Sequence, residues 1–407
     1  MGRFIIKGGK PLCGRVRVSG SKNAALPIIF ASLVTDGVSR LYNLPDISDV
    51  SDALSIVGEL GARVWREGSV TLIDTRELHY AVPDLGAVRR IRASTYLIGA
   101  CLTRFGRAEL LPFGGCSFSH RPIDIHLDAA RAFGARIEKD VITATELHGA
   151  DVYLRLPSVG ATVNALIIAA SVYGRTTIQG AAREPHILAL ISYLRSAGAE
   201  IRISGDTITV SGGRLRGASA VIPGDMIEAG TYLAASIVTG GRVYVEGFDM
   251  RELSSFTSPL VASGVIEDVS DGGIGLLGRP KREISVRTGA YPAFPTDLQP
   301  VFSTILASSQ GGSIEEEVWP NRFGYLDELA RIGLSYSRDG SRARIFPSIV
   351  YPGRVKPSDL RGAAAAVILS LRAEGESAVE QGELVLRGYD SFAEKLRTLG
   401  AEITYKD

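Results

Sequence analysis

Charged or polar side chains recur at the starts of helix-like segments throughout this chain. They are Lys22 with its neighbour Asn23, Arg92, Arg121, Asp297, Arg322, Asp359, Arg361 and Arg387. A helix N-terminus carries unpaired N–H groups and partial positive charge, so a cation placed there does not complement the helix dipole. The pattern is explained if an anionic ligand lies between these helix starts. We therefore predict a polyanion-binding cleft between two domains, although a single arginine at such a position is more often solvated or ion-paired.

Asp297 and Asp359 are the two carboxylates in this basic setting. A carboxylate among arginines stays ionised, so it can accept a proton or orient a cation. Each aspartate also stands where a helix N-cap is expected, and there its side chain would only accept backbone N–H groups. The sequence leaves both interpretations open.

Cys116 lies in a segment rich in glycine and proline, which indicates a loop and not core structure. The segment ends at Arg121, and an electropositive neighbour lowers the pKa of a thiol. Cys116 is therefore a candidate nucleophile or proton donor, with an unreactive loop cysteine as the alternative. The run Ser158-Val-Gly160 precedes another apolar helix, where its backbone N–H groups could bind a phosphate.

Composition excludes several classes of function. The 407 residues include 45 Lys and Arg against 44 Asp and Glu, and a net charge of +1 disfavours a dedicated nucleic-acid-binding protein. No apolar run reaches the ~20 residues of a membrane span, and three cysteines imply no disulfide framework. We expect a reduced, cytoplasmic protein without membrane contacts. The five histidines lack zinc-binding spacing and there is no nucleotide fingerprint, so no metal or cofactor is implied.

A sixfold repeat underlies these positions. A glycine follows an amphipathic segment and leads into a strand at Gly61, Gly134, Gly198, Gly264, Gly333 and Gly400, which gives repeats of about 68 residues. Glycine is favoured there because the residue after a helix often adopts a left-handed conformation. Each repeat also contains a helix that is apolar nearly all round, which is typical of a protein interior.

The repeats predict an α/β protein with two domains. Apolar helices are expected over residues 23–34, 93–102, 163–172, 229–238, 298–307 and 362–371, and amphipathic ones over ranges such as 51–60 and 391–399. Three repeats would form a domain over residues 21–225, and three another over 1–20 with 226–407. The N-terminal strand would cross to pair with the second domain. The alternative is a scaffold whose repetition serves packing alone.

A series of motifs runs through the whole chain in a familiar order. They are Gly20-Ser-Lys-Asn-Ala-Ala-Leu-Pro27, Arg92-Ala-Ser94, Gly114-Gly-Cys-Ser-Phe-Ser-His-Arg-Pro-Ile-Asp-Ile-His126, Pro157-Ser-Val-Gly-Ala-Thr162, Ala181-Ala-Arg-Glu-Pro185, Glu228-Ala-Gly-Thr231, Phe294-Pro-Thr-Asp-Leu-Gln299, Asn321-Arg-Phe323, Ser358-Asp-Leu-Arg361 and Arg387-Gly-Tyr389. Together they resemble the enolpyruvyl transferase family, in the branch that acts on a UDP-sugar. The resemblance implies an inside-out α/β barrel in two domains.

The resemblance also implies an activity, which is transfer of the enolpyruvyl group of phosphoenolpyruvate to the 3′-hydroxyl of UDP-N-acetylglucosamine, with release of phosphate. That reaction commits the sugar to peptidoglycan synthesis, and so to cell-wall biogenesis, cell shape and cell division. An acceptor such as shikimate 3-phosphate or a uridine nucleotide is the alternative within the family. A catalytically idle scaffold is disfavoured because Lys22, Cys116, Asp297 and Arg387 are all present.

Roles for individual residues follow from the resemblance alone. Lys22 and Asn23 would contact phosphoenolpyruvate, while Arg121 and Arg387 would hold its phosphate and carboxylate. Cys116 would donate a proton, form a covalent adduct and react with the epoxide fosfomycin. Asp297 would take up the hydroxyl proton. The UDP-sugar site would be lined by Arg92, Arg121, Pro122, Ile123, Asp124, Ile125, Ser158, Val159, Gly160, Asp297 and Val318, with Arg322, Asp359 and Arg361 completing the wall of the second domain.

Overall fold

The computed structural model describes residues 2–114, 122–270 and 272–407, and it divides into two compact units. The first unit contains residues 20–114 and 122–223, and the second contains residues 2–19 and 224–407. Within the described residues the chain passes from one unit to the other next to Gly20 and next to Gly224. These crossings lie within one or two residues of the domain limits expected from the repeats. Cys116 and Arg121 lie outside the described residues.

The elements of the first unit alternate between helices and short strands. Its helices are α1 (Lys22–Ser32), α2 (Ser48–Glu59), α3 (Leu85–Arg90), the 3-10 helix η1 (Arg92–Tyr96), α4 (Leu97–Phe105), α5 (Asp124–Ala132), α6 (Val159–Ser171) and α7 (Pro185–Ala197). Its strands are β3 (Thr35–Asp36), β4 (Val38–Tyr42), β5 (Arg63–Glu67), β6 (Val70–Asp74), β7 (Arg107–Glu109), β8 (Arg136–Glu138), β9 (Val141–Thr143), β10 (Asp151–Tyr153), β11 (Gly174–Gln179), β12 (Glu200–Ser204), β13 (Thr207–Gly212), β14 (Leu215–Arg216) and β15 (Ser219–Val221).

The second unit repeats this alternation. Its helices are α8 (Met226–Thr239), η2 (Met250–Leu253), α9 (Ser254–Ala262), η3 (Thr296–Leu298), α10 (Gln299–Ala307), α11 (Tyr325–Ala330), α12 (Leu360–Ser370), η4 (Gly382–Arg387) and α13 (Phe392–Thr398). Its strands are β1 (Arg3–Gly8), β2 (Cys13–Arg17), β16 (Arg242–Glu246), β17 (Ile266–Ser270), β18 (Gly273–Leu277), β19 (Ile284–Arg287), β20 (Gly312–Glu315), β21 (Ser335–Asp339), β22 (Arg342–Phe346), β23 (Arg354–Val355), β24 (Gly375–Glu380) and β25 (Glu402–Lys406).

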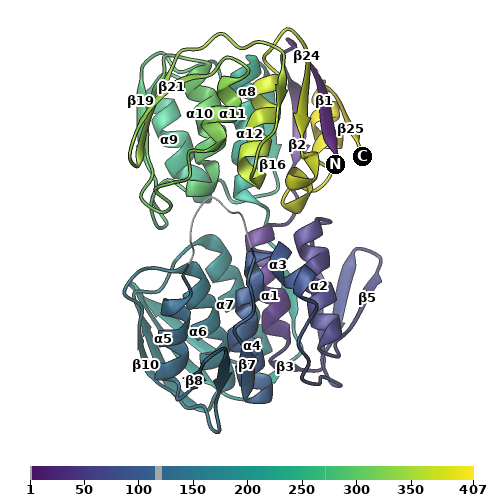
Figure 1. Ribbon diagram of the computed structural model, residues 1–407, viewed down its shortest axis with the longest axis vertical. Coiled ribbons are helices and arrows are strands. Elements are labelled where there is room, and N and C mark those ends of the chain that lie inside the picture. Colours follow the sequence, from purple (N-terminus) through teal and green to yellow (C-terminus); the bar gives the residue numbers. More distant parts are fainter. Residues whose placement is uncertain (1, 115–121, 271) are drawn as a thin grey trace. The chain divides into compact units, whose positions relative to one another are not determined.

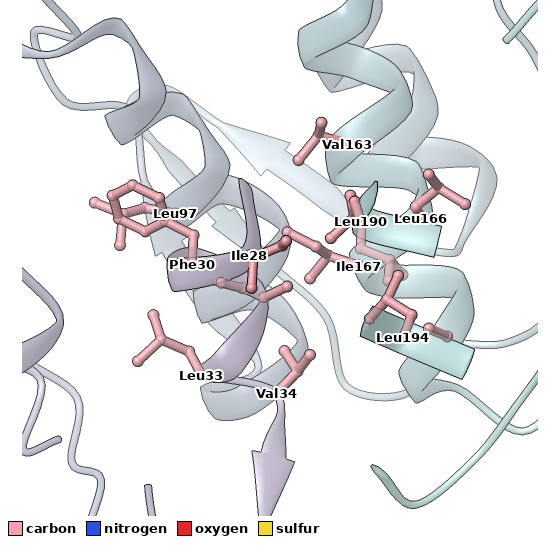
Figure 2. Packing of buried hydrophobic residues seen from close by; sticks show 14 of the residues in the cluster. Ile28, Phe30, Leu33, Val34, Leu97, Val163, Leu166, Ile167, Leu190 and Leu194 are labelled. Atoms are coloured by element: carbon pink, nitrogen blue, oxygen red, sulfur yellow. The ribbon is translucent and has the colours of Figure 1, made fainter. Parts of the chain in front are cut away.

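Helices without a polar face fill the interior of each unit, as their composition predicts. In the first unit α4 packs against both α1 and α6, and α6 buries every residue from Ala161 to Ala170. Figure 2 shows Ile28, Phe30, Leu97 and Ile167 meeting there from three of these helices. In the second unit α8, α10 and α12 pack against one another and lie side by side (Figure 1). Small residues allow this close packing of backbones.

Two of the expected helices begin four residues away from the predicted start, and the others begin within three residues of it. Residues 92–96 form the separate 3-10 turn η1 before α4, although the sequence predicts one helix over 93–102. Helix α6 begins at Val159, four residues earlier than predicted, because the Ser158 hydroxyl caps it by accepting the Ala161 N–H.

Small sheets surround the buried helices, so the expected mixed α/β architecture is confirmed. Among the described residues the larger sheets of the first unit have the strand orders β15-β4-β6-β5, β10-β11-β13-β12 and β7-β9-β8. Those of the second unit are β17-β18-β16-β2, β19-β20-β22-β21 and β23-β24-β1-β25. Strand β1 lies between β24 and β25, with Phe4 opposite Val379 and Tyr405. The predicted pairing of the N-terminal strand with the C-terminal half is therefore confirmed.

The repeating glycine has the backbone conformation that its position predicts. The φ angles are 89°, 97°, 121°, 99°, 102° and 97° at Gly61, Gly134, Gly198, Gly264, Gly333 and Gly400. An L-residue with a Cβ atom is disfavoured in this region, so the glycines let each amphipathic helix turn directly into a strand. In the part of the chain that the structure describes, no helix has the length and apolarity needed to cross a membrane.

Candidate functional site

Lys22 is held by a buried carboxylate in the first unit. It is the first residue of α1, and its Nζ lies 2.6 Å from Oδ2 of Asp49, which is in the first turn of α2. The two side chains are 12% and 3% exposed. Removing a buried partner leaves an uncompensated charge, so Asp49 fixes the position of the ammonium group. Asn23, next along α1, is half-buried.

Arg92 is the first residue of η1 and is half-buried. Burial lowers the pKa of its guanidinium group, because removal from water disfavours the charged form. A partly desolvated arginine is stabilised by an anion, which is consistent with the predicted role in binding a phosphorylated ligand.

The segment before α5 presents its polar groups to solvent. Pro122 and Asp124 are exposed, whereas Ile123 and Ile125 are half-buried. Asp124 is the first residue of α5, and its carboxylate pairs with Arg155. A hydrogen bond from Arg155 lowers the pKa of Asp124, so this carboxylate stays ionised. An acidic residue in the first helical turn also complements the helix dipole.

The run Ser158-Val159-Gly160, predicted to precede the helix, forms the N-cap and first two residues of α6, and its role in phosphate binding stays a prediction. Val159 and Gly160 are half-buried. A Cβ atom on Gly160 would lie 2.6 Å from Cε1 of His126, so glycine is required for the close approach of that ring. His126 is itself buried, on α5.

A buried ionic cluster organises the second unit. Oδ1 of Asp297 accepts a hydrogen bond from Nη1 of Arg322 at 2.8 Å, and its Oδ2 accepts from Nη2 and Nε of Arg361 at 3.0 and 3.2 Å. The two arginine side chains are 5% and 2% exposed, whereas that of Asp297 is 29% exposed. Structure therefore brings together three residues that are 25 to 64 positions apart in sequence.

This cluster sets the charge of Asp297. Burial alone would raise the pKa of the carboxyl group, but the opposite charges of Arg361 and Arg322 outweigh it and hold the pKa well below its usual range. Asp297 is thus an ionised carboxylate that remains partly accessible to a ligand. It can accept a hydrogen bond or a proton from a bound hydroxyl group.

Of the two roles that the sequence left open for Asp359, the structure shows the helix N-cap. Its Oδ1 accepts the backbone N–H groups of Arg361 and Gly362, at 3.0 and 3.1 Å, and it is the N-cap of α12. By contrast, the Asp297 carboxylate caps no helix, since the start of η3 has no side-chain cap. Asp359 thereby positions Arg361, which lies in the first turn of α12 and stacks 5.3 Å from the ring centroid of Tyr389.

Two arginines do not begin helices as the sequence suggested. Arg322 lies in a turn before α11, which begins at Tyr325, and its guanidinium group extends to Asp297 and Thr296. Arg387 is the last residue of η4, and α13 begins only at Phe392. A cation at the end of a helical turn complements the local dipole. The position of Arg387 therefore does not by itself indicate an anionic ligand.

Glu316 shapes the backbone around Val318. Its Oε1 accepts from the Val318 and Trp319 N–H groups at 3.0 and 2.9 Å, and its Oε2 accepts from the Thr296 hydroxyl at 2.9 Å. Glu316 is completely buried. It therefore ties the Val318 turn to the residue that precedes Asp297.

Three residues that position the candidate site were not predicted from the sequence, namely Asp49, Glu316 and His126. Asp49 stands on the apolar face of α2 beside Val50 and Ala53, and a carboxylate on such a face is a signal that could have been noticed. Glu316 follows Ile314 with the alternation of a strand, which predicts that it points inward.

Two further properties of the described residues concern a buried cysteine and metal binding. Cys101 is buried in α4, and burial raises the pKa of its thiol to about 12, so its sulfur is a poor nucleophile near neutral pH. Among the described residues there is no group of three or more His, Cys, Asp or Glu that could hold a metal ion. The cleft between the two halves stays a prediction.

Comparisons with known proteins agree on one family. The family model for EPSP synthase (3-phosphoshikimate 1-carboxyvinyltransferase) matches residues 6–396. The UDP-N-acetylglucosamine 1-carboxyvinyltransferase of Halothermothrix orenii is 41% identical over 411 residues, which cover 99% of each chain. The UDP-N-acetylglucosamine 1-carboxyvinyltransferase 1 of Streptococcus agalactiae is 38% identical over 420 residues, again 99% of each chain.

Solved structures confirm the expected enolpyruvyl transferase fold. The enolpyruvyl transferase NikO from Streptomyces tendae has a TM-score of 0.89 at 26% identity, covering 100% of this chain and 99% of that one. EPSP synthase from Acinetobacter baumannii, with a TM-score of 0.72 at 18% identity and complete coverage of both chains, shares the fold. The chain therefore belongs to the EPSP synthase family of enolpyruvyl transferases.

Proposed function

We propose that this protein transfers the enolpyruvyl group of phosphoenolpyruvate to the 3′-hydroxyl of UDP-N-acetylglucosamine and releases phosphate. The observation that carries the proposal is full-length similarity, at about 40% identity, to proteins named for that reaction. The site chemistry supports it, because both substrates are polyanions and the proposed binding residues Lys22, Arg92 and Arg361 are cationic. The reaction would take place in the cytoplasm, as the committed step of peptidoglycan synthesis.

The proposed mechanism needs one acid and one base. The Cys116 thiol gives a proton to C3 of phosphoenolpyruvate, and the sugar 3′-oxygen bonds to C2 while Asp297 takes up the hydroxyl proton. A C3 proton of the adduct then returns to the Cys116 thiolate while the C–O bond to phosphate breaks, and the departing phosphate takes the proton held by Asp297, which restores the double bond and frees inorganic phosphate. Because two arginines lower the pKa of Asp297, proton transfer to it must accompany formation of the new C–O bond.

The proposed binding residues divide between the two substrates. Lys22, Asn23, Arg121 and Arg387 would hold phosphoenolpyruvate. The UDP-sugar would lie along Arg92, the segment from Arg121 to Ile125, the Ser158–Gly160 turn and Val318, while Arg322, Asp359 and Arg361 would support Asp297. Closure of the two units over the substrates would exclude water and strengthen each ion pair.

A phosphate-release assay tests the assignment. The purified protein is expected to release phosphate from phosphoenolpyruvate when UDP-N-acetylglucosamine is supplied, and to release none without an acceptor. Parallel reactions with shikimate 3-phosphate and with UMP test the alternative acceptors, and faster turnover with either would overturn the proposed acceptor. The Cys116→Ser variant controls for contaminating phosphatase, because it should lose roughly 10²–10⁴-fold in rate.

A further inference from the structure

Asn164 and His126 form a buried polar pair in the first unit that the proposed mechanism does not use. Asn164 is 1% exposed and lies on α6, and His126 is 5% exposed and lies on α5. The Asn164 Nδ2 atom lies 2.8 Å from Nδ1 of His126. Burying an amide and an imidazole is unfavourable unless their hydrogen bonds are made, so the pairing defines which atoms donate.

The surroundings of Asn164 fix the orientation of its amide. Its oxygen lies 2.7 Å from the backbone nitrogen of Gly99, and that N–H can only donate. Its nitrogen lies 3.1 Å from the carbonyl oxygen of Thr95, which can only accept. Rotating the amide by half a turn would oppose donor to donor and acceptor to acceptor. The group facing His126 is therefore an NH2 donor.

An NH2 donor at Nδ1 determines the protonation of the imidazole. Nδ1 must accept, so the ring proton of neutral His126 is on Nε2. A doubly protonated ring would set a second N–H against the amide donor. The charged groups facing the ring are Arg92, which opposes protonation, and Asp124, which favours it but is already paired with Arg155. Geometry and charge together keep the ring neutral.

The other side of the ring faces the start of α6. A Cβ atom at Gly160 would lie 2.8 Å from Nε2, so the ring lies against the Ser158–Gly160 turn. Within the residues that the structure describes, Nε2 has no hydrogen-bond partner. The Nε2–H group is thus an available donor at the turn that would line the nucleotide-sugar site.

We propose that Asn164 is a positioning residue, which locks His126 as the neutral Nε2–H tautomer so that its N–H donates to an oxygen of the bound UDP-sugar. The substrate part of this inference rests on the proposed function. From its place on α6, Asn164 also bonds α4 and two elements that carry proposed binding residues, η1 and α5. It acts through His126 and does not need to touch the ligand.

Nitrogen NMR of the 15N-histidine-labelled full chain tests the lock directly. The His126 resonances are assigned by their absence in His126→Gln. Nδ1 is expected to have the shift of an unprotonated nitrogen and Nε2 that of a protonated one, unchanged from about pH 5 to about pH 8. The exposed His148 in the same unit serves as the reference resonance outside the buried pair. A protonated Nδ1, or titration of His126 within that pH range, would overturn the proposal.

The near-isosteric variant Asn164→Asp tests the effect on the substrate. A carboxylate oxygen facing Nδ1 accepts a hydrogen bond from it, so the neutral ring becomes the Nδ1–H tautomer, whose Nε2 no longer donates; protonation to the imidazolium at lower pH would restore that donor. Loss of the fixed donor should raise KM for UDP-N-acetylglucosamine about tenfold or more, make it dependent on pH, and change kcat little. The control Ser39→Ala deletes a buried hydrogen bond to Tyr193 in the same unit and should leave KM unchanged.

The two proposals fail in different ways. An unchanged KM in folded Asn164→Asp would overturn the positioning role even if the wild-type tautomer were as expected. If Asn164→Asp does not fold, the wild-type nitrogen spectrum with and without UDP-N-acetylglucosamine decides, because hydrogen bonding must shift Nε2 and an unmoved Nε2 would refute the donor role. Absence of turnover with every acceptor would refute the proposed function, whereas the tautomer is measured without turnover.

Discussion

Substituting Asp297 by asparagine would test the buried ionic cluster, because it removes one charge and keeps the shape. In the wild type three hydrogen bonds from Arg322 and Arg361 end on this carboxylate. Asparagine retains one oxygen acceptor but turns an NH2 group toward one of the guanidinium groups. Both arginines, 5% and 2% exposed, would lose the charge that compensates them.

The expected loss of stability follows from this geometry. Removing one partner of a buried ion pair typically costs about 3–5 kcal/mol. Because the Asp297 side chain is 29% exposed, water can partly replace it, so we expect the lower end, about 3 kcal/mol. For a unit of this size that corresponds to a fall in Tm of roughly 6–12 °C. The turnover rate should also fall roughly 10²–10⁴-fold, since the proton acceptor is lost.

Urea unfolding and phosphate release measure the two effects separately. The matched control is Glu283→Gln, which breaks an exposed pair with Arg344 in the same unit and should cost no more than about 1 kcal/mol. The lowered pKa of Asp297 adds a signature in pH. Its stabilisation is present above the unfolded pKa of 3.8 and is lost as the pH falls toward the folded value, so wild type and variant should converge only in acid. Equal losses in the two variants would refute the buried-pair argument, and unchanged turnover would refute the role as proton acceptor.

Three further outcomes are expected. Asp49→Asn should release Lys22 from its 2.6 Å partner and raise KM for phosphoenolpyruvate about tenfold, measured in the phosphate assay; an unchanged KM would mean that Asp49 does not position the ammonium group. Fosfomycin should add one adduct, located by mass spectrometry at Cys116, whereas Cys101 with its raised pKa should stay unmodified, and the reverse would refute the reactivity assignment. Burial lowers the pKa of His126 to about 4, so its contribution to stability is present above pH 6.5 and should fall by about 3 kcal/mol as the pH drops to 4; an identical pH profile for His126→Gln would contradict this.

The fold could be predicted largely because the same local pattern of apolar helix, amphipathic helix and terminal glycine recurs six times. Apolar helices without a polar face, such as α6 and α12, must be buried wherever they occur. Positive φ at the repeating glycines follows from the helix end itself. The predicted boundaries failed where capping or a 3-10 turn changed the start, as at Ser158 and Arg92.

Part of the candidate site could also be predicted, because its residue types are unusual for their positions. Lys22 and Arg361 interrupt apolar helix starts, and the motifs around them identify the family. Composition alone could not distinguish Asp297 from Asp359, since both precede an apolar helix among basic residues.

The sequence by itself determined the repeat, the buried helices, the family and the set of candidate charged residues. Only the tertiary structure decided what each charge does, because the deciding partners are distant in the chain. Asp297 is kept ionised by Arg361, which lies 64 residues away. The carboxylate of Asp359 instead accepts backbone N–H groups two and three residues ahead. His126 is buried against Asn164, which is 38 residues away, and burial lowers the pKa of its imidazole. Side chains far apart in sequence set a pKa only once packing has brought them within hydrogen-bonding distance and excluded water.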